Sequence, residues 1–505
     1  MTDHEREPAP EPPTEKIRNE GARLKAAVAL VVVAGLVLAG LVSGGVFGDR
    51  DDGLAAASAS ATTVASPSLV VTPSAAPPSG SRPSAASASD FPPSDSPTNP
   101  SSPGRIAVVD DSGALSTMNG DGGSRVSYPM PGVVFGFPAW SPDGSRIAVT
   151  GEGADDTAIY VFTVAKNDGP TVIYRSPDRP PFYLYWTPDG RSVTFLATEA
   201  ASIALRIAPA DGSAPPDGSG PGSILREGAP LYFDWVDADR LLLHVGLGSD
   251  AFAGEVGRDG APIEQPLPGT GIFRSASVSP DGRYLAYVRS ETEVTGQLVV
   301  ASRDGSATHE LPVAGPAAFV FDPTGDRLAT ISADGPVDPT IGLPIGPLRI
   351  VDPATGATRT LLDAPIVAFF WSPDGRTIAT IQPTVPGDDN VAAGQGFILA
   401  GAIEPRSRAA AGAQAPGTAG RLTFVDASSG EIRADRIVRL AGHFVNQLLP
   451  YFDQYALSHS LWSPDSASVV IPLVSATGRN QLVVVPADGS DPRPIADGDK
   501  GFWSR

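Results

Sequence analysis

Short blocks of apolar and turn-forming residues repeat along most of this chain. A typical block is WSPDGRTIATI, which begins at Trp371. The large apolar residue predicts the end of one strand. Ser-Pro-Asp-Gly predicts a tight turn, because proline fixes φ and glycine accepts a positive φ, and the apolar run predicts a second, buried strand. Related blocks begin at Trp140, Trp186, Trp235, Val278, Phe321 and Trp462, and a fragment begins at Phe502.

The spacing of these blocks predicts the architecture. The first seven large residues are 43 to 50 residues apart, except for one interval of 91. Roughly 25 residues after most blocks comes a second turn, usually Asp-Gly between apolar runs, which is a strong hairpin signal. Two turns in repeats of this length favour four-stranded propeller blades. We therefore expect an all-β chain with an eight-bladed β-propeller over residues 105–505, with seven blades as the alternative.

The last block predicts how the ring closes. The fragment at Phe502 contains only the start of a block, whereas the folded region begins with the apolar run RIAVV at Arg105. Joined end to end, the two pieces form one complete block. The C-terminal residues are therefore expected to supply the innermost strand of the first blade, which leaves no open sheet edge at the seam.

The repeated W-S-P-D-G-x-x-[IVL]-A motif resembles the PD40 (WD40-like) repeats of TolB-like β-propellers, over roughly residues 105–505. The resemblance implies a propeller fold and a binding habit rather than a reaction. The chain departs from this family in having neither a TolB-type α/β domain before the repeats nor a hydrolase domain beside them.

The N-terminal part has a different pattern. Residues 1–25 are polar and are expected to form a disordered cytoplasmic tail. Ala26–Phe47 is an uncharged apolar run, preceded by basic residues, that is long enough to span a bilayer. We predict a single transmembrane helix with a cytoplasmic N-terminus and an extracytoplasmic propeller. A cleaved signal peptide is the alternative.

Two further segments are expected to lack a fixed fold. Residues 48–104 are rich in Ala, Ser and Pro and predict a disordered linker that holds the propeller away from the membrane. Residues 383–420, which are rich in Ala and Gly, predict a disordered insertion within the propeller.

Composition narrows the choice of partners and chemistry. A net charge of −20 argues against nucleic acid, because phosphate contacts need basic patches, and the absence of cysteine excludes disulfides and thiolate chemistry. Nucleophile-elbow, zinc-protease, P-loop and dinucleotide motifs are absent from the sequence. We therefore predict no catalytic residues, no metal and no cofactor. The turn aspartates, one in most blocks, are interpreted as turn caps.

Two loop stretches stand out as candidate binding residues. Strand order places the long loops on the face opposite the Ser-Pro-Asp-Gly turns, and such loops usually carry binding residues. Aromatic, amide and arginine side chains are typical of contact surfaces, although the aromatic rings could instead pack over strand ends. The first group is Arg175, Arg179, Phe182 and Tyr183. The second group is His443, Phe444, Asn446, Gln447, Tyr451, Asp453, Gln454 and Tyr455.

These observations favour a membrane-anchored binding module of the cell envelope. The expected ligand is an envelope protein, a peptide or a glycan held on the long-loop face. The alternative is an envelope enzyme, a glycan hydrolase or lyase, with polar residues in the propeller funnel. Two facing carboxylates or a metal at the channel mouth would favour the enzyme, and an aromatic rim would favour the binding module.

Overall fold

The computed structural model describes residues 104–164, 169–200, 202–220, 223–246, 251–263, 267, 276–290, 295–335, 343–384 and 418–505. All of them belong to one compact unit. The predicted cytoplasmic tail, membrane helix and linker lie outside the described residues. Within the described ranges, no helix is both long and apolar enough to cross a membrane.

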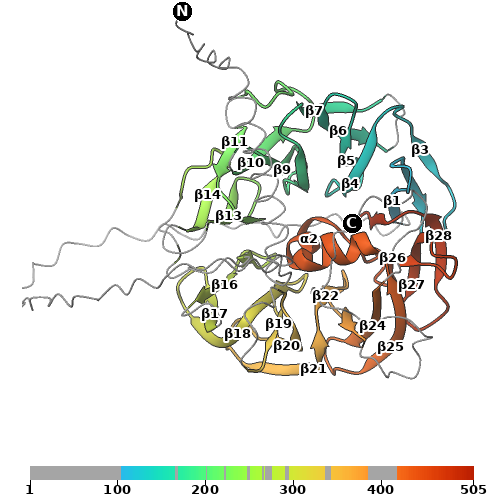
Figure 1. The fold of residues 1–505 in the computed structure, drawn as a ribbon. Coiled ribbons are helices and arrows are strands. Elements are labelled where there is room, and N and C mark those ends of the chain that lie inside the picture. The colour runs from blue at the N-terminus through green and yellow to red at the C-terminus, as the bar shows by residue number, and fades with distance from the viewer. Residues whose placement is uncertain are drawn as a thin grey trace, which may run out of the picture. The chain divides into compact units, whose positions relative to one another are not determined.

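The described chain is built almost entirely of antiparallel sheets that follow one another around a ring (Figure 1). Three consecutive sheets come from the first part of the chain. The first contains β1 (Arg105–Val109), β2 (Leu115–Asn119) and β3 (Val126–Tyr128). The second contains β4 (Val134–Trp140), β5 (Arg146–Glu152), β6 (Thr157–Thr163) and β7 (Thr171–Ser176). The third contains β8 (Pro181–Trp186), β9 (Ser192–Thr198), β10 (Ile203–Pro209) and β11 (Ile224–Glu227).

The next two sheets continue around the ring. One has three strands, β12 (Leu231–Trp235), β13 (Arg240–Val245) and β14 (Phe252–Gly257). The other has seven strands, β15 (Ser277–Val278), β16 (Tyr284–Ser290), β17 (Thr295–Ser302), β18 (Thr308–Phe321), β19 (Leu328–Ala333), β20 (Gly346–Val351) and β21 (Thr358–Ile366). Strand β18 belongs to two groups, because its first half pairs with β17, its second half pairs with β19, and the register shifts between Ala314 and Ala318.

The last sheet also has seven strands. They are β22 (Ala368–Trp371), β23 (Thr377–Pro383), β24 (Thr418–Asp426), β25 (Ile432–Leu440), β26 (Ser468–Val474), β27 (Asn480–Pro486) and β28 (Arg493–Asp497). A single residue pair, Leu440 with Leu473, joins its two groups of strands. Between them lie the helical turns η2 (Phe444–Leu448) and η3 (Leu449–Tyr451) and the helix α2 (Phe452–Ser458).

The ring closes as the sequence predicts. Strand β29 (Lys500–Trp503) pairs antiparallel with β1, with Ile106 opposite Trp503 and Val109 opposite Lys500. The first sheet therefore contains residues from both ends of the described chain, and in Figure 1 the red strands lie beside the blue ones.

The turn predictions also hold. The glycine of each predicted second turn, from Gly122 to Gly489, has a φ between +71° and +86°, a region that glycine enters without a steric penalty. The predicted insertion 383–420 lies mainly outside the described residues. Its ends differ from the expectation, because residues 383 and 418–420 are strand residues of β23 and β24, and Gly420 pairs with Pro383.

Most of the repeated tryptophans donate a hydrogen bond to the block before their own, Trp235 to the hydroxyl of Thr194 and four others to a backbone carbonyl. The indole N–H of Trp186 donates to the carbonyl of Ala139, at 2.9 Å, and Ala139 is the residue just before the preceding tryptophan. The same bond to the equivalent carbonyl recurs from Trp140, Trp371 and Trp462. The indole Nε1 of Trp503, at the seam, is buried and has no partner. The motif thus fixes the spacing between innermost strands as well as making a turn.

Candidate binding site

The segment 441–460, predicted to be a loop, is folded into helical turns. Phe444, Leu448, Leu449 and Phe452 are buried, and their spacing gathers them on one side of the segment. Pro450 lacks a backbone N–H and stands at the start of the short 3₁₀ turn that separates η2 from α2. The apolar side therefore determines which way the segment faces.

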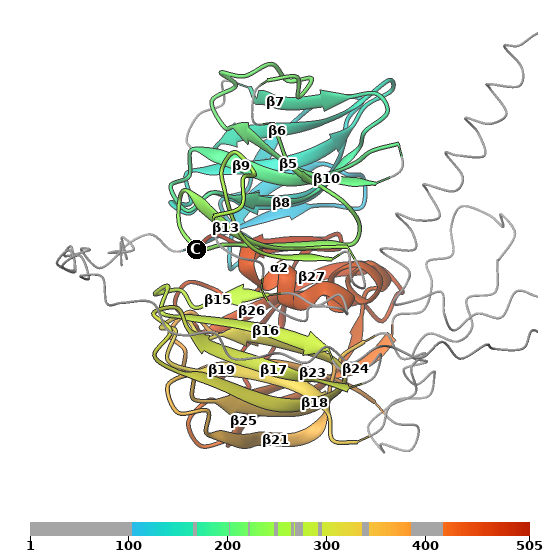
Figure 2. The same ribbon diagram turned by 90° about the vertical axis from the view of Figure 1, so that its left-hand side faces the viewer.

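Helix α2, the last part of this segment, lies in the centre of the ring. Helix α2 crosses the middle of the circle of strands in Figure 1 and lies between opposite sheets in Figure 2. It contacts the innermost strands β8, β12 and β22 as well as β18. The ring of Phe452 packs edge-on against Phe369 and Phe370, with centroids 5.1 and 5.8 Å away. Aromatic residues of the innermost strands thus form the wall around the segment.

Gln454 attaches the helix to this wall. Its side-chain Nε2 donates to the carbonyl of Phe233 at 2.7 Å, and its Oε1 accepts from the backbone N–H of Phe233 at 3.2 Å. Phe233 lies in β12, an innermost strand whose free edge has no further strand to pair with. The amide of Gln454 therefore satisfies the backbone of β12 as a neighbouring strand would.

Tyr183 in β8 makes the second attachment. Its hydroxyl donates to the carbonyl of Gln454 at 2.8 Å and accepts from the Gln454 side chain and from Ser458. Complete burial raises the pKa of Tyr183 far above its usual value, so the hydroxyl keeps the proton that it donates. Tyr183 has a positive φ of 46°, an uncommon conformation for a tyrosine, at a register shift in β8.

Two histidines on the segment are held neutral by the aromatic wall. His443 stacks on Phe137 at 5.0 Å, and His459 meets Phe502 edge-on at 4.7 Å. Burial, reinforced by nearby Lys500, lowers the pKa of His443 to about 4, and burial with the charge of Arg505 lowers the pKa of His459 to about 3. The Nε2 atom of each ring is buried without a hydrogen-bond partner.

A buried carboxyl group stands on the wall nearby. Asp234 is 4% exposed and accepts hydrogen bonds from Tyr185, Ser277 and the N–H of Val278, all between 3.2 and 3.4 Å long. Burial outweighs these bonds and raises its pKa to about 6. Asp234 was not predicted from the sequence, although a signal existed. Asp234 occupies the position before the motif tryptophan. The other complete tryptophan blocks carry an uncharged residue there, namely Ala139, Tyr185, Phe370 or Leu461.

The structure separates the predicted residues of 441–460 by exposure. Phe444 and Gln454 are buried, and His443, Tyr451, Asp453 and Tyr455 are partly buried. Asn446 and Gln447 are exposed. Gln454 and the aromatic residues that drew attention in the sequence therefore serve largely to hold the segment in the ring, whereas Asn446 and Gln447 face the solvent.

The other predicted group divides in two. Tyr183 joins the central segment, and Phe182 packs beside it against the same hydrophobic cluster. Arg175 forms an ion pair with Asp156 at 3.3 Å, and Arg179 forms one with Glu199 at 3.1 Å. These two arginines thus belong to ion pairs within the ring, and Glu199 also pairs with the buried Arg206, which was not predicted from the sequence.

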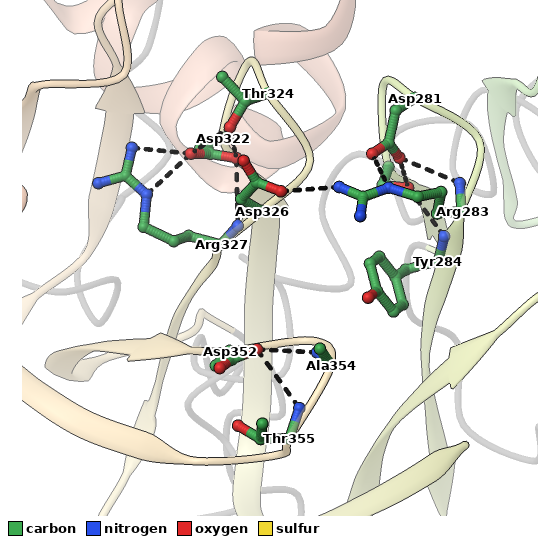
Figure 3. Close-up of polar contacts among 11 residues, drawn as sticks. Asp281, Arg283, Tyr284, Asp322, Thr324, Asp326, Arg327, Asp352, Ala354 and Thr355 are labelled. Atoms are coloured by element: carbon green, nitrogen blue, oxygen red, sulfur yellow. Dashed lines mark hydrogen bonds and ion pairs between the residues drawn. The ribbon is translucent and has the colours of Figure 1, made fainter. Parts of the chain in front are cut away.

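The turn aspartates act as caps, as expected. Figure 3 shows Asp281 and, in the next block, Asp322 accepting bonds within their own turns. Arg283 joins Asp281 to Asp326 of the neighbouring turn, and Arg327 pairs with the fully buried Asp322 (Figure 3). Arg327 also donates to the carbonyl of Gly375 in the block after it. No group of three or more metal-binding side chains occurs among the residues that the structure describes.

The sheets around a central axis define a β-propeller-like, all-β fold. No family model matches the chain, and no curated protein sequence matches it. Solved structures with a similar arrangement include a eukaryotic initiation factor. It matches at 12% identity over 80% of this chain and 98% of its own, with a TM-score of 0.46. TolB from Acinetobacter baumannii matches at 14% identity over 65% of this chain and 62% of its own, with a TM-score of 0.33. An oligogalacturonate lyase in complex with manganese matches at 11% identity over 53% and 79%, with a TM-score of 0.36.

Proposed function

We propose that this protein is a membrane-anchored, extracytoplasmic binding module of the PD40, TolB-like kind, with an eight-bladed propeller. The grouping of strands supports eight blades. Each seven-stranded sheet supplies two groups, at the register shift in β18 and at the single Leu440–Leu473 pair. Two of the eight groups, β12–β14 and β26–β28, have only three named strands. Isolated bridges from Val256 to Pro262 and from Trp462 to Val469 supply the fourth, short strand in each.

The occupied centre of the ring carries the functional proposal. The chain itself occupies the centre of the ring, where Phe452, Gln454 and Tyr455 contact the innermost strands. A filled centre makes the ring a rigid support, and a rigid support with exposed polar side chains suits recognition by preformed contacts. The ligand would be an envelope protein, a peptide or a glycan.

The outward side of segment 441–460 is the proposed contact surface. The segment starts where β25 ends. The last residue of β25, Leu440, pairs with Leu473 near the C-terminal end of β26, whereas the turn Ser463–Ser466 precedes the N-terminal end of β26. The segment and this turn therefore lie at opposite ends of the strands. Asn446 and Gln447 are its exposed polar residues. An amide both donates and accepts hydrogen bonds, as the recognition of peptide backbones or sugar hydroxyls requires.

A crosslinking pull-down from intact cell envelopes tests this surface. The variant Asn446→Ala/Gln447→Ala should reduce capture of the partner about tenfold, the effect of losing two intermolecular hydrogen bonds. The control Arg191→Gln/Arg376→Gln changes exposed residues that directly follow the Thr-Pro-Asp-Gly turn at 187–190 and the Ser-Pro-Asp-Gly turn at 372–375, and it should capture as much as the unchanged protein. Equal capture by both double variants would rule out the proposed surface.

The proposed location has a simple test because the chain contains no cysteine. A cysteine at exposed Thr308 should react with a membrane-impermeant maleimide added to intact cells. A cysteine at the fully buried Ala148 should react only after denaturation. Labelling of Thr308→Cys only after the cells are broken open would contradict an extracytoplasmic propeller.

Asp234 supports a second candidate, an envelope glycan hydrolase or lyase. A carboxyl group with a pKa of about 6 is suited to general acid catalysis near neutral pH, and Tyr185 lies within hydrogen-bonding distance. Release of sugars from envelope polysaccharides that disappears in Asp234→Asn would favour this candidate. Activity that is equal in both proteins would remove Asp234 from it.

A further inference from the structure

A cavity of about 210 Å³ lies between two neighbouring sheets, away from the central segment. Its walls include Tyr174 of β7, Phe195 of β9 and Arg206 of β10. The loop between β10 and β11 covers it, through residues such as Ala214 and Gly218. The cavity thus has an aromatic wall on one side and a guanidinium group on another.

Two hydrogen bonds hold the described part of the covering loop. The carbonyl of Pro216 accepts a 2.5 Å hydrogen bond from the backbone N–H of Arg175 in β7, and Ser223 donates to the carbonyl of Gly218. A Cβ atom at Gly218 would come within 3.0 Å of the Arg206 side chain and 3.2 Å of the Tyr174 ring. The glycine therefore allows the loop to approach closely while the space beside Phe195 stays open.

The charges around the cavity favour an anion. Arg206 is 2% exposed, and it shares the carboxylate of Glu199 with Arg179, so two guanidinium groups face one carboxylate. Its Nη1 makes one long contact, 3.4 Å, to the carbonyl of Gly218. Arg258, also in the lining, is matched by Asp189. The two charged residues in the described lining, Arg206 and Arg258, are both arginines, so no carboxylate lines the cavity although the net charge of the chain is −20.

We propose that this cavity binds a small organic acid, a carboxylate attached to a ring-sized apolar body. Apolar cavities of about 150 Å³ hold a benzene molecule, so 210 Å³ accommodates a ring with a short acidic chain. The ring would lie against Tyr174 and Phe195, whose own rings are 4.7 Å apart. The carboxylate would lie beside Nη1 of Arg206, because charged hydrogen bonds to a buried guanidinium are the strong ones.

The test uses the full chain and three probes of the same shape, 4-fluorophenylacetate, 2-(4-fluorophenyl)ethanol and 2-(4-fluorophenyl)ethylamine. Binding is followed by broadening of the fluorine NMR signal as the protein is added. We expect the acid to bind with a Kd of about 1 mM or tighter, the affinity available to a ligand of this size. The alcohol should bind at least about tenfold more weakly, and the amine should not bind.

Two loop variants locate the binding. Ala214→Phe places a ring in the cavity and should weaken binding of the acid at least about tenfold. Ser213→Phe, one residue earlier on an exposed position outside the lining, is the matched control and should bind within about twofold of the unchanged chain. If Ala214→Phe does not fold, the comparison of the three probes on the unchanged protein still decides the charge preference.

Each other outcome overturns the proposal. Absence of broadening by the acid at 5 mM, about five times the expected Kd, would show that the cavity holds only water. Equal binding of acid and alcohol would remove Arg206 from recognition, and unchanged binding by Ala214→Phe would place the ligand elsewhere. The proposal does not depend on the partner of segment 441–460, so the two fail independently.

Discussion

Replacing Gln454 by leucine tests whether the side-chain amide holds the central segment to the ring. Leucine fills a similar volume but can neither donate nor accept hydrogen bonds. The variant leaves the N–H and C=O of Phe233 without their partner and removes one donor from the hydroxyl of Tyr183. These groups are buried, and the segment prevents water from replacing the amide.

The expected cost follows from the number of groups left unpaired. Each buried backbone group without a partner costs about 1–3 kcal/mol, so two such groups lower the free energy of unfolding by about 2–6 kcal/mol. The matched control is Gln447→Leu, because Gln447 is exposed on the same segment and a surface change there stays within about 0.5 kcal/mol.

Urea unfolding of the full chain gives the difference in free energy, and hydrogen exchange gives its location. In Gln454→Leu the amide of Phe233 should exchange faster, while amides in outer strands, such as that of Ile432, should keep their rates. The reasoning fails if the two leucine variants have the same urea midpoint and the Phe233 amide stays equally protected in both.

Three further predictions concern other parts of the ring. Trp186→Phe should cost about 1 kcal/mol more than Trp503→Phe in urea unfolding, because the Trp186 indole N–H is hydrogen-bonded and the buried Trp503 N–H is not. Arg327→Met should lower the free energy of unfolding by about 3 kcal/mol, because it removes the ion-pair partner of the fully buried Asp322. Arg283→Met removes an exposed ion pair and should lower it by less than about 1 kcal/mol. Equal losses in the two variants would contradict this difference in burial. Burial lowers the pKa of His459 to about 3, so between pH 6.5 and 3 the unfolded chain binds the extra proton and stability falls as the pH falls, by about 2 kcal/mol from this group at pH 5. His459→Phe should flatten the plot of urea midpoint against pH, and an unchanged slope would refute this.

Local rules were enough to predict much of the fold. The turn chemistry of Ser-Pro-Asp-Gly and Asp-Gly depends on neighbouring residues only, so strands and turns could be placed from short windows of sequence. Closure by the C-terminal residues was also predictable, because an incomplete block at Phe502 matched the apolar run after Arg105. The bonds of the motif tryptophans were not predicted, since their acceptors are backbone carbonyls about one repeat away.

The candidate site was predicted less well because it depends on distant residues. Residues 441–460 were recognised by composition, but composition does not distinguish a surface loop from a segment that enters the ring. The contact between Tyr183 and Gln454 spans 271 residues, and no local pattern records it. Arg206 was overlooked for a similar reason, since its role depends on Glu199, just after the neighbouring strand β9, and on the covering loop at Gly218.

The pairing of β29 with β1 has a consequence for the order of synthesis. Arg105 and Ser504, which are hydrogen-bonded at this seam, are 399 residues apart. At a translation rate of about 5–20 residues per second, β1 waits roughly 20 to 80 seconds for the strand that completes its sheet. During that interval its apolar inner edge, RIAVV, is open to pairing with other chains. A nascent chain is therefore exposed to wrong pairing at β1, which can form a sheet with another nascent chain. Several ribosomes translating one mRNA at close spacing should increase that risk.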